Sequence, residues 1–346
     1  MSRSSAGRVD VTSALFLGLP GGGTTGVPAA FREHPDAARL AGAVAAGQSA
    51  GAALVARSTL HALGDVLGEL PGAGDVVALD ESVYPISRWA ALRACEKGAE
   101  VRSYPHHRPR PARTGRRLFL VTDGWCPGCG RPAPLAGLRR TAAATGGAVI
   151  VDDTLAFGVL GRRRSPDDPF GDGTGTVRWA GLAHDGIVWV ASLAKAYGSP
   201  LAVVTGDRAT VARLADAGSR WHCSPPPPSD LVAALAALSD PRGAAGRQRL
   251  RRNVLRVRHD LLAGGLRPVG RAFPVVGVPP RRGTDPVRWR DLLAARGVDA
   301  VVQRPRCTTG PLLTLHVRAD HTPAQLDRVV REVLATSQDV RARRSA

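Results

Sequence analysis

The chain has 346 residues, of which 44% are hydrophobic and 22% charged, as in ordinary soluble globular proteins. The formal net charge is +18, but the arginines are scattered along the chain and aromatic residues make up only 4%. Because base stacking needs aromatic side chains, we expect no nucleic-acid partner. No apolar run is long enough to span a membrane, and the N-terminus lacks an apolar segment of signal-peptide type. We therefore expect a cytoplasmic protein.

The first 30 residues read as an irregular arm, and regular elements follow it. The hydrophobic pattern predicts strands at 52–55, 75–79, 101–104, 118–122, 148–151, 186–190, 201–205, 273–278 and 312–317. It predicts helices from Asp36, at about 58–70, 85–95, 134–144, 209–217, 229–262 with a break at Pro241, 286–296 and 323–335. This alternation indicates an α/β fold with a mainly parallel, doubly wound sheet, followed by a smaller α+β C-terminal domain. We expect an arm at 1–30, a large domain at 31–235 and a small domain at 236–346.

The cysteines are five in number, and an odd count without a signal peptide indicates reduced thiols. Cys126 and Cys129 form a CxxC pair, but a structural zinc site usually draws on two such pairs and the sequence has no second one. Glycine and proline flank the pair, unlike the helix-opening CxxC of redox proteins. His106 and His107 lie on an expected loop with no partner cluster nearby. We expect no metal site, and the role of Cys126 and Cys129 stays open.

Two stretches organise the large domain. The apolar run 148–151 leads into the carboxylates Asp152 and Asp153, and the apolar run 186–190 leads to Lys195. Ligands of open α/β sheets collect at the carboxyl ends of the strands, so a carboxylate and an amine should meet there. The chain has only two lysines, Lys97 and Lys195, among a large number of arginines. Unlike arginine, lysine can deprotonate and form a Schiff base with a carbonyl compound or pyridoxal phosphate (PLP).

The Ser58-Thr59 pair opens the predicted helix after the strand 52–55. The free amides and the dipole of a helix N-terminus favour a phosphate there. An ordinary serine N-cap explains the same pattern equally well.

Several motifs together resemble the fold-type-I PLP-dependent enzymes, most closely the α-oxoamine synthase branch of the class I/II aminotransferase superfamily. The resemblance covers nearly the whole chain and rests on the segments 11–19 ("SSNDYLGL" in the family), 123–135 ("EG…APL"), 151–161 ("VDDAHGxGVLG"), 192–196 ("TLSKA") and 319–322 ("AAHT"). The aspartate and lysine motifs at their observed separation make the strongest part of it.

The resemblance implies a role for several residues. Lys195 would carry PLP covalently, and Asp152, rather than Asp153, would pair with the protonated pyridine nitrogen, keeping the ring an electron sink. Ser192 and the backbone at Thr59 and Leu60 would hold the phosphate. Tyr84 stands where the family has a histidine that stacks on the ring, and a tyrosine can stack equally well. The family also implies a homodimer whose active sites take residues from both subunits.

Three departures from the family concern contacts to the cofactor or the substrate. Leu155 replaces the histidine that contacts the cofactor's 3′-oxygen, and the loop 127–130 replaces the family's "SMDG". Thr314 stands where the family has the arginine that clamps a substrate carboxylate. Thr314, His316 and Arg318 would share one face of a strand, so Arg318 could serve as a clamp only with a shifted geometry.

These observations predict a PLP-dependent transferase acting at the Cα of an amine or amino acid. Carbon–carbon bond formation with an acyl thioester is the chemistry typical of the family, and transamination is the alternative because the first steps are shared. A third possibility is a degenerate member that only binds, which the presence of Asp152 and Lys195 disfavours.

Overall fold

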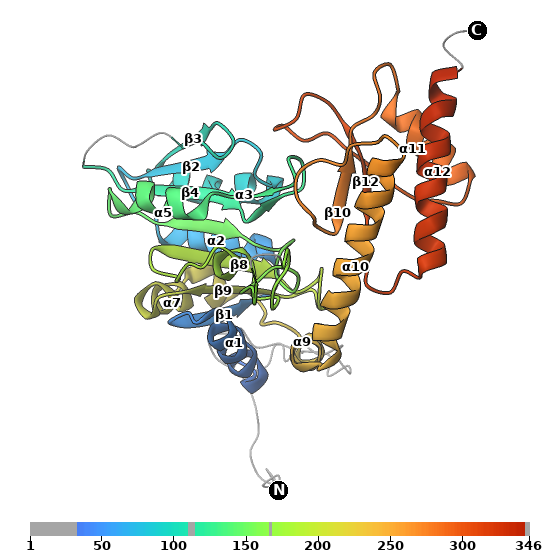
Figure 1. Ribbon diagram of the computed structural model, residues 1–346. Coiled ribbons are helices and arrows are strands. Elements are labelled where there is room, and N and C mark those ends of the chain that lie inside the picture. The colour runs from blue at the N-terminus through green and yellow to red at the C-terminus, as the bar shows by residue number, and fades with distance from the viewer. Residues whose placement is uncertain (1–32, 110–114, 166–167, 343–346) are drawn as a thin grey trace, which may run out of the picture.

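The computed structural model describes residues 33–109, 115–165 and 168–342 (Figure 1). The arm at 1–30, including the 11–19 motif, lies outside the described residues. The centre of the large domain is a seven-stranded sheet in the order β1-β9-β8-β7-β4-β2-β3. Its strands are β1 (Ala52–Ala56), β2 (Val76–Asp80), β3 (Glu100–Tyr104), β4 (Leu118–Asp123), β7 (Val149–Asp152), β8 (Ile187–Ser192) and β9 (Ala202–Gly206).

Strand direction decides where ligands can bind. Strand β9 runs antiparallel to its neighbours β1 and β8, and all other neighbouring pairs are parallel. The carboxyl ends of β1, β2, β4, β7 and β8 therefore lie along one edge of the sheet. The predicted mainly parallel, doubly wound fold is confirmed.

Helices cover both faces of this sheet, so its strands are buried on both sides. The helices before the small domain are α1 (Pro35–Gln48), α2 (Thr59–Glu69), α3 (Pro85–Ala90), α4 (Leu92–Glu96), α5 (Leu135–Ala143), α6 (Thr176–Trp179), α7 (Arg208–Ala215), α8 (Gly218–His222) and α9 (Pro228–Ser239). Alternate strand residues enter opposite cores. Val76 and Ala78 pack with α1, α5 and α9, whereas Val77 and Leu79 pack with α2, α4 and α7.

The small domain carries a three-stranded antiparallel sheet in the order β10-β12-β11. Its elements are α10 (Arg242–Ala263), β10 (Val275–Val278), α11 (Pro286–Ala295), β11 (Val301–Gln303), β12 (Leu312–His316) and α12 (Pro323–Ala342). Its core also takes in Trp125, Leu160 and Phe170 from the large domain. The two domains therefore share apolar packing beside the edge where the parallel strands end (Figure 1).

The helix break expected at Pro241 is confirmed, since α9 ends at Ser239 and α10 begins at Arg242. The predicted domain boundary between 235 and 236 falls inside α9. Leu231 and Ala234 of α9 belong to the core of the large domain, whereas Val254 and Val257 of α10 belong to that of the small domain. The packing therefore favours a division at the α9–α10 junction. The sequence pattern missed β11, the hairpin β5 (Trp125–Cys126) and β6 (Arg131–Pro132), and the short helices α6 and α8.

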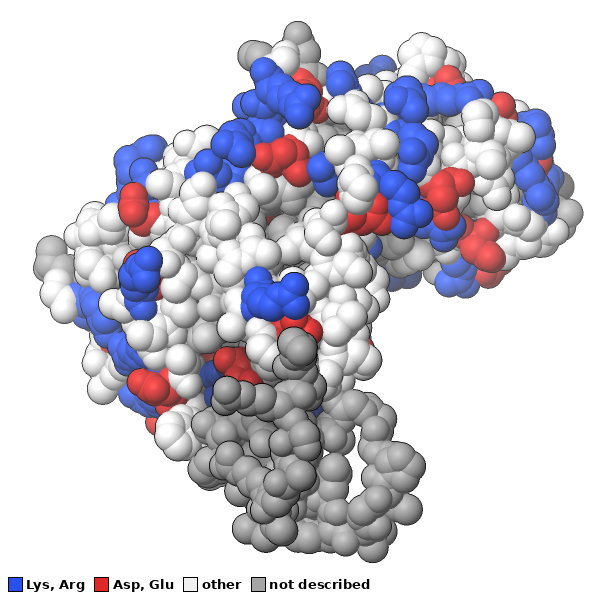
Figure 2. All heavy atoms as spheres, turned by 90° about the horizontal axis from the view of Figure 1, so that it is seen from below, with Lys and Arg blue, Asp and Glu red and all other residues white. Residues whose placement is uncertain are grey.

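None of the described helices is both long and apolar enough to cross a membrane. In the view of Figure 2, basic side chains are spread over the surface with acidic side chains between them. That distribution agrees with the scattered arginines of the sequence.

Candidate active site

Two buried carboxylates meet at the carboxyl edge of the large sheet. Asp152 is the last residue of β7, and the strand register places it beside Asp123, the last residue of β4. Asp152 is 7% exposed, and its Oδ1 accepts a hydrogen bond from the Thr154 amide at 3.0 Å. Burial raises the pKa of Asp152. Burial, and then the nearby Asp152, raise the pKa of Asp123. Within the described residues neither carboxylate has an ion-pair partner, so a cationic group bound at these strand ends would stabilise their charged forms.

Asp153, the next residue, already has hydrogen-bond donors within the protein. Its carboxylate accepts hydrogen bonds from the Thr176 amide, the Thr176 hydroxyl and Trp189 Nε1, each at 2.7 Å. Burial raises the pKa of Asp153 to about 7, against the pull of these three donors. Asp153 thus holds α6 and β8 in place, and Asp152 as the carboxylate that faces a ligand stays a prediction.

Lys195 lies on the exposed turn that follows β8, at the same edge of the sheet. This turn and β7 are joined through Thr154, whose hydroxyl accepts a hydrogen bond from the Ser192 amide at 3.1 Å. From the small domain, His316 at the end of β12 comes near Lys195. Partial burial, and then the Lys195 ammonium, lower the pKa of His316. Lys195 therefore lies within electrostatic range of the small domain.

An anion could bind at the N-terminus of α2. Ser58 caps this helix, its Oγ accepting a hydrogen bond from the His61 amide at 3.4 Å. The amides of Thr59 and Leu60 precede the first internal hydrogen bonds of the helix, so they remain available to a phosphate. The Ser192 hydroxyl donates to the Leu201 carbonyl at 3.2 Å and accepts from the Ala194 amide at 3.1 Å. To donate to a phosphate, Ser192 must turn its proton away from Leu201.

Tyr84 follows β2 at the same edge, and the residue is 58% exposed. Its amide donates to both oxygens of Asp123 at 3.2 Å, which fixes the loop before α3 against the carboxylate pair. Leu155, where the family has a histidine, packs against the core of the small domain. An apolar side chain there strengthens the contact between domains instead of offering a polar contact.

The two residues predicted to bind substrate lie in different surroundings. Thr314 is buried in the middle of β12, and its hydroxyl has no hydrogen-bond partner among the described residues. Arg318 lies beyond the end of β12, is 65% exposed, and pairs with both oxygens of Asp320 at 2.7 and 2.8 Å. Strand β12 ends at His316, two residues before Arg318, and the shared face with Thr314 stays a prediction. The geometry lends no support to Arg318 as a clamp.

Asp123 and His316 were not among the predicted site residues. Asp123 ends an apolar strand in the same way as Asp152, so the signal that identified Asp152 could have found it too. His316 carries no local signal, because its position near Lys195 depends on how the domains pack.

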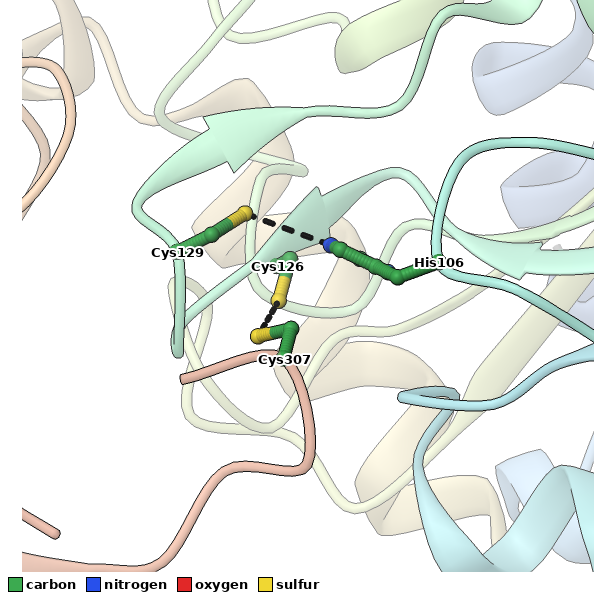
Figure 3. A group of neighbouring side chains, drawn as sticks. All are labelled: His106, Cys126, Cys129 and Cys307. Atoms are coloured by element: carbon green, nitrogen blue, oxygen red, sulfur yellow. Dashed lines mark hydrogen bonds between the residues drawn. The ribbon is translucent and has the colours of Figure 1, made fainter. Parts of the chain in front are cut away.

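A second polar cluster lies a few residues from the carboxylate pair. The ligand atoms of His106, Cys126, Cys129 and Cys307 all lie within 4.8 Å of one another (Figure 3). His106 Nε2 is 3.3 Å from the Cys129 sulfur, and the sulfurs of Cys126 and Cys307 are 3.5 Å apart. The expectation that no partner cluster lies near His106 is therefore wrong, because the partners come from other parts of the chain.

Comparison with solved structures identifies the class of fold. A serine palmitoyltransferase from S. paucimobilis, solved with a bound PLP–myriocin aldimine, superposes with a TM-score of 0.75 at 21% identity, covering 89% of this chain and 78% of that one. The 8-amino-7-oxononanoate synthase of Francisella tularensis gives a TM-score of 0.74 at 20% identity, covering 90% and 89%. The architecture is that of the fold-type-I PLP-dependent transferases.

Comparison of sequences narrows the class to a family. The chain is 31% identical over 298 residues to the 8-amino-7-oxononanoate synthase of Geobacter metallireducens, covering 81% of this chain and 72% of that protein. It is 30% identical over 227 residues to a putative 8-amino-7-oxononanoate synthase of Thermosynechococcus vestitus, where the match spans 55% of the relative. With a relative from Halorhodospira halophila it spans 60%. No family model matches the chain. The chain belongs to the α-oxoamine synthase family.

Proposed function

We propose that this protein binds PLP and acts as a transferase at the Cα of an amine or amino-acid substrate. One observation carries the proposal: Asp152 is a buried carboxylate without a cationic partner among the described residues, at the sheet edge that also bears Lys195. A protonated pyridine nitrogen is a cation that would match this carboxylate. The cost of burying Asp152 unpaired would fall once such a partner is bound.

Other residues at this edge of the sheet would bind the phosphate, the ring face and the aldehyde carbon of the cofactor. The N-terminus of α2 and Ser192 would hold its phosphate, Tyr84 would cover one ring face, and Lys195 would attach it covalently. When bound, the cofactor supplies an electron sink for a carbanion at the substrate's Cα. Asp152 would keep the proton on the ring nitrogen, while the shared apolar core of the two domains would exclude water from one side of the site.

Within this reaction class we propose acyl transfer with carbon–carbon bond formation from an acyl thioester. Membership of the α-oxoamine synthase family supports this step over transamination. Thr314 gives a reason to expect a different amine substrate, because it stands where the family has the carboxylate-binding arginine. A hydroxyl offers one neutral hydrogen bond of about 1 kcal/mol, whereas a bidentate guanidinium pair contributes about 1.5–3 kcal/mol. We therefore propose that the substrate is not held by a carboxylate clamp at Thr314.

We also propose that two copies of the chain form the working enzyme. Large apolar side chains near the α2 N-terminus and on the adjoining α3–α4 segment are exposed, although they flank the site. They are Leu60 (43% exposed), Tyr84 (58%), Trp89 (61%) and Leu92 (63%). Because α2 packs against both α3 and α4, these side chains lie on neighbouring elements. A second copy covering them would remove apolar surface from water and close the site.

The reaction type is tested by supplying PLP, a panel of amino acids and acyl thioesters, and measuring release of free thiol and of keto acid separately. The proposal predicts thiol release that depends on both substrates. Keto acid formed without thiol release would establish an aminotransferase instead.

The substrate site is tested by two substitutions. If the clamp is absent, Arg318→Ala leaves KM for an amino acid unchanged, and Thr314→Arg improves amino-acid turnover. A strong rise of KM in Arg318→Ala would show that Arg318 leaves Asp320 and reaches the substrate. Efficient wild-type turnover of glycine, alanine or serine, indifferent to both substitutions, would refute the assignment of Thr314 to the substrate site.

A further inference from the structure

The cysteine–histidine cluster of His106, Cys126, Cys129 and Cys307 has the donor set of a metal centre. Its four ligand atoms are one imidazole nitrogen and three sulfurs, and Figure 3 shows the side chains converging on one point. Zinc in structural sites takes four such ligands in a tetrahedron, with Zn–S bonds of about 2.3 Å and Zn–N bonds of about 2.0 Å. These bonds place the sulfurs about 3.8 Å from one another and about 3.5 Å from the nitrogen. The observed separations of 3.5 Å between sulfurs and 3.3 Å from nitrogen to sulfur are close to those values.

We propose that this cluster is a structural Zn²⁺ site. All four coordination positions are filled by the chain, which leaves no open position for a substrate. Zinc matches three thiolates and one neutral imidazole, whereas magnesium and calcium require oxygen ligands. When the ion binds, the three thiols lose their protons to solvent and become thiolates.

The histidine is held in the tautomer that a metal needs. Its Nδ1 lies 2.7 Å from Oδ1 of the buried Asp80. With Nδ1–H donating a hydrogen bond to this carboxylate, the lone pair of His106 lies on Nε2, which faces the sulfurs. Asp80 is itself fixed, because the amides of Ser82 and His107 each donate to it at 2.8 Å. Asp80 is therefore a positioning residue for the zinc ligand.

The backbone around the CxxC pair is shaped to admit the fourth ligand. Cys126 and Cys129 lie on the β5–β6 hairpin, and the amide of Gly130 closes its turn on the Cys126 carbonyl at 2.9 Å. A Cβ atom at Gly128 would lie 2.7 Å from the Cys307 sulfur and 2.3 Å from the side chain of Pro305. Only glycine at 128 lets the segment with Cys307 approach so closely.

The position of the site suggests what the ion does. Cys307 lies in the small domain between β11 and β12, whereas the other three ligands belong to the large domain. A second contact runs alongside, where the Arg271 amide donates to the Gly130 carbonyl at 2.8 Å. Zinc would thus fasten the small domain to the hairpin that follows Asp123. It would hold the wall of the cofactor site without taking part in the reaction, so the inference stands independently of the proposed function.

Metal content of the full-length wild-type protein, purified under reducing conditions without chelator, tests the site directly. Elemental analysis should find about one zinc per chain. Cys129→Ser and Cys307→Ser should lose it, whereas Cys95→Ser and Cys223→Ser, the two cysteines outside the cluster, should keep it. Zinc in the wild type no higher than in Cys129→Ser, or stoichiometric iron in its place, would overturn the proposal.

Wild-type protein alone provides a second test if a variant fails to fold. Cobalt(II) exchanged for the zinc should give the intense visible bands of a tetrahedral thiolate site. A thiol reagent should modify two cysteines before release of the metal by a chelator and all five afterwards. Weak octahedral cobalt bands, or a Cys126–Cys307 disulfide that persists under reductant, would contradict a metal site.

Discussion

The cofactor edge and the cysteine–histidine cluster lie side by side but are built in different ways. At the cofactor edge, Asp123, Asp152 and Ser192 each end a buried strand of one sheet. In the cluster, the ligands come from a hairpin and two loops, and Cys126 and Cys307 are 181 positions apart in the chain. Strand ends are marked by local hydrophobic pattern, whereas the meeting of distant loops is not. The first site can therefore be predicted from short motifs, and the second only from the fold.

The two regions nevertheless depend on the same two strand ends, those of β2 and β4. Asp80 ends β2 and orients His106, while Tyr84 follows four residues later and contacts Asp123. Asp123 ends β4, and Cys126 follows it within three residues. We expect changes on the cofactor side to abolish turnover without releasing zinc, and changes on the zinc side to act on stability and metal affinity first.

The largest effect should follow Lys195→Ala. Loss of the amine removes covalent attachment of the cofactor, and turnover should fall by at least about 1,000-fold. Turnover and the visible absorbance of protein incubated with PLP measure this. Lys97→Ala is the matched control, since Lys97 is the other lysine of the chain and pairs with Glu69 at 3.2 Å. A comparable loss in Lys97→Ala would contradict the assignment.

Substitutions of the two adjacent aspartates should have different effects, one on turnover and the other on stability. Asp152→Asn cannot hold a proton on the ring nitrogen, so kcat should fall at least about 100-fold while PLP still binds. Asp153→Asn loses part of a three-donor network and should lower the free energy of unfolding by about 1–3 kcal/mol. Steady-state kinetics and chemical denaturation of both variants make the comparison. Full turnover in Asp152→Asn with none in Asp153→Asn would reverse the two roles.

His184 is a buried histidine outside the cysteine cluster, and we expect it to affect the pH dependence of stability but not metal binding. His184 lies between Gln48 Oε1 at 3.2 Å and Thr205 Oγ1 at 3.4 Å. Burial, and then Arg178, lower the pKa of His184 to about 4. Because the unfolded chain protonates this histidine near pH 6.5 and the folded chain does not until about pH 4, stability is complete above 6.5. It should decline by about 3 kcal/mol on acidification across that interval.

The His184→Gln variant should lack this part of the acid sensitivity, as measured by denaturation at a series of pH values. It should also keep its zinc, since His184 is outside the cluster. An unchanged pH profile in the variant would show that His184 is not the group responsible.

The smallest effect concerns Asp80. Replacing it by asparagine removes the carboxylate that orients His106, and zinc affinity should fall about 10–100-fold. Competition with a chromophoric chelator measures the affinity, and Asp75→Asn, on an ion pair with Arg117 at the other end of β2, is the control. Equal affinities in Asp80→Asn and the wild type would show that the contact to Nδ1 does not support metal binding.

The fold could be predicted because nearly every strand of the large sheet is a short apolar run bounded by polar or glycine residues. Asp152 and Lys195 were predicted as site residues for the same reason, since each lies after such a run. The pairing of Arg318 with Asp320 could not be predicted, because it forms in the loop beyond β12, which stops at His316. His316 and Cys307 could not be assigned to a site because domain packing alone brings them there.

The most direct test of the account is borohydride reduction of the wild-type protein reconstituted with PLP, followed by peptide mapping. We predict a single pyridoxyl group, on the peptide that contains Lys195. A pyridoxyl group on Lys97, or none on any peptide, would contradict the central claim that the edge bearing Asp152 and Lys195 is a PLP site.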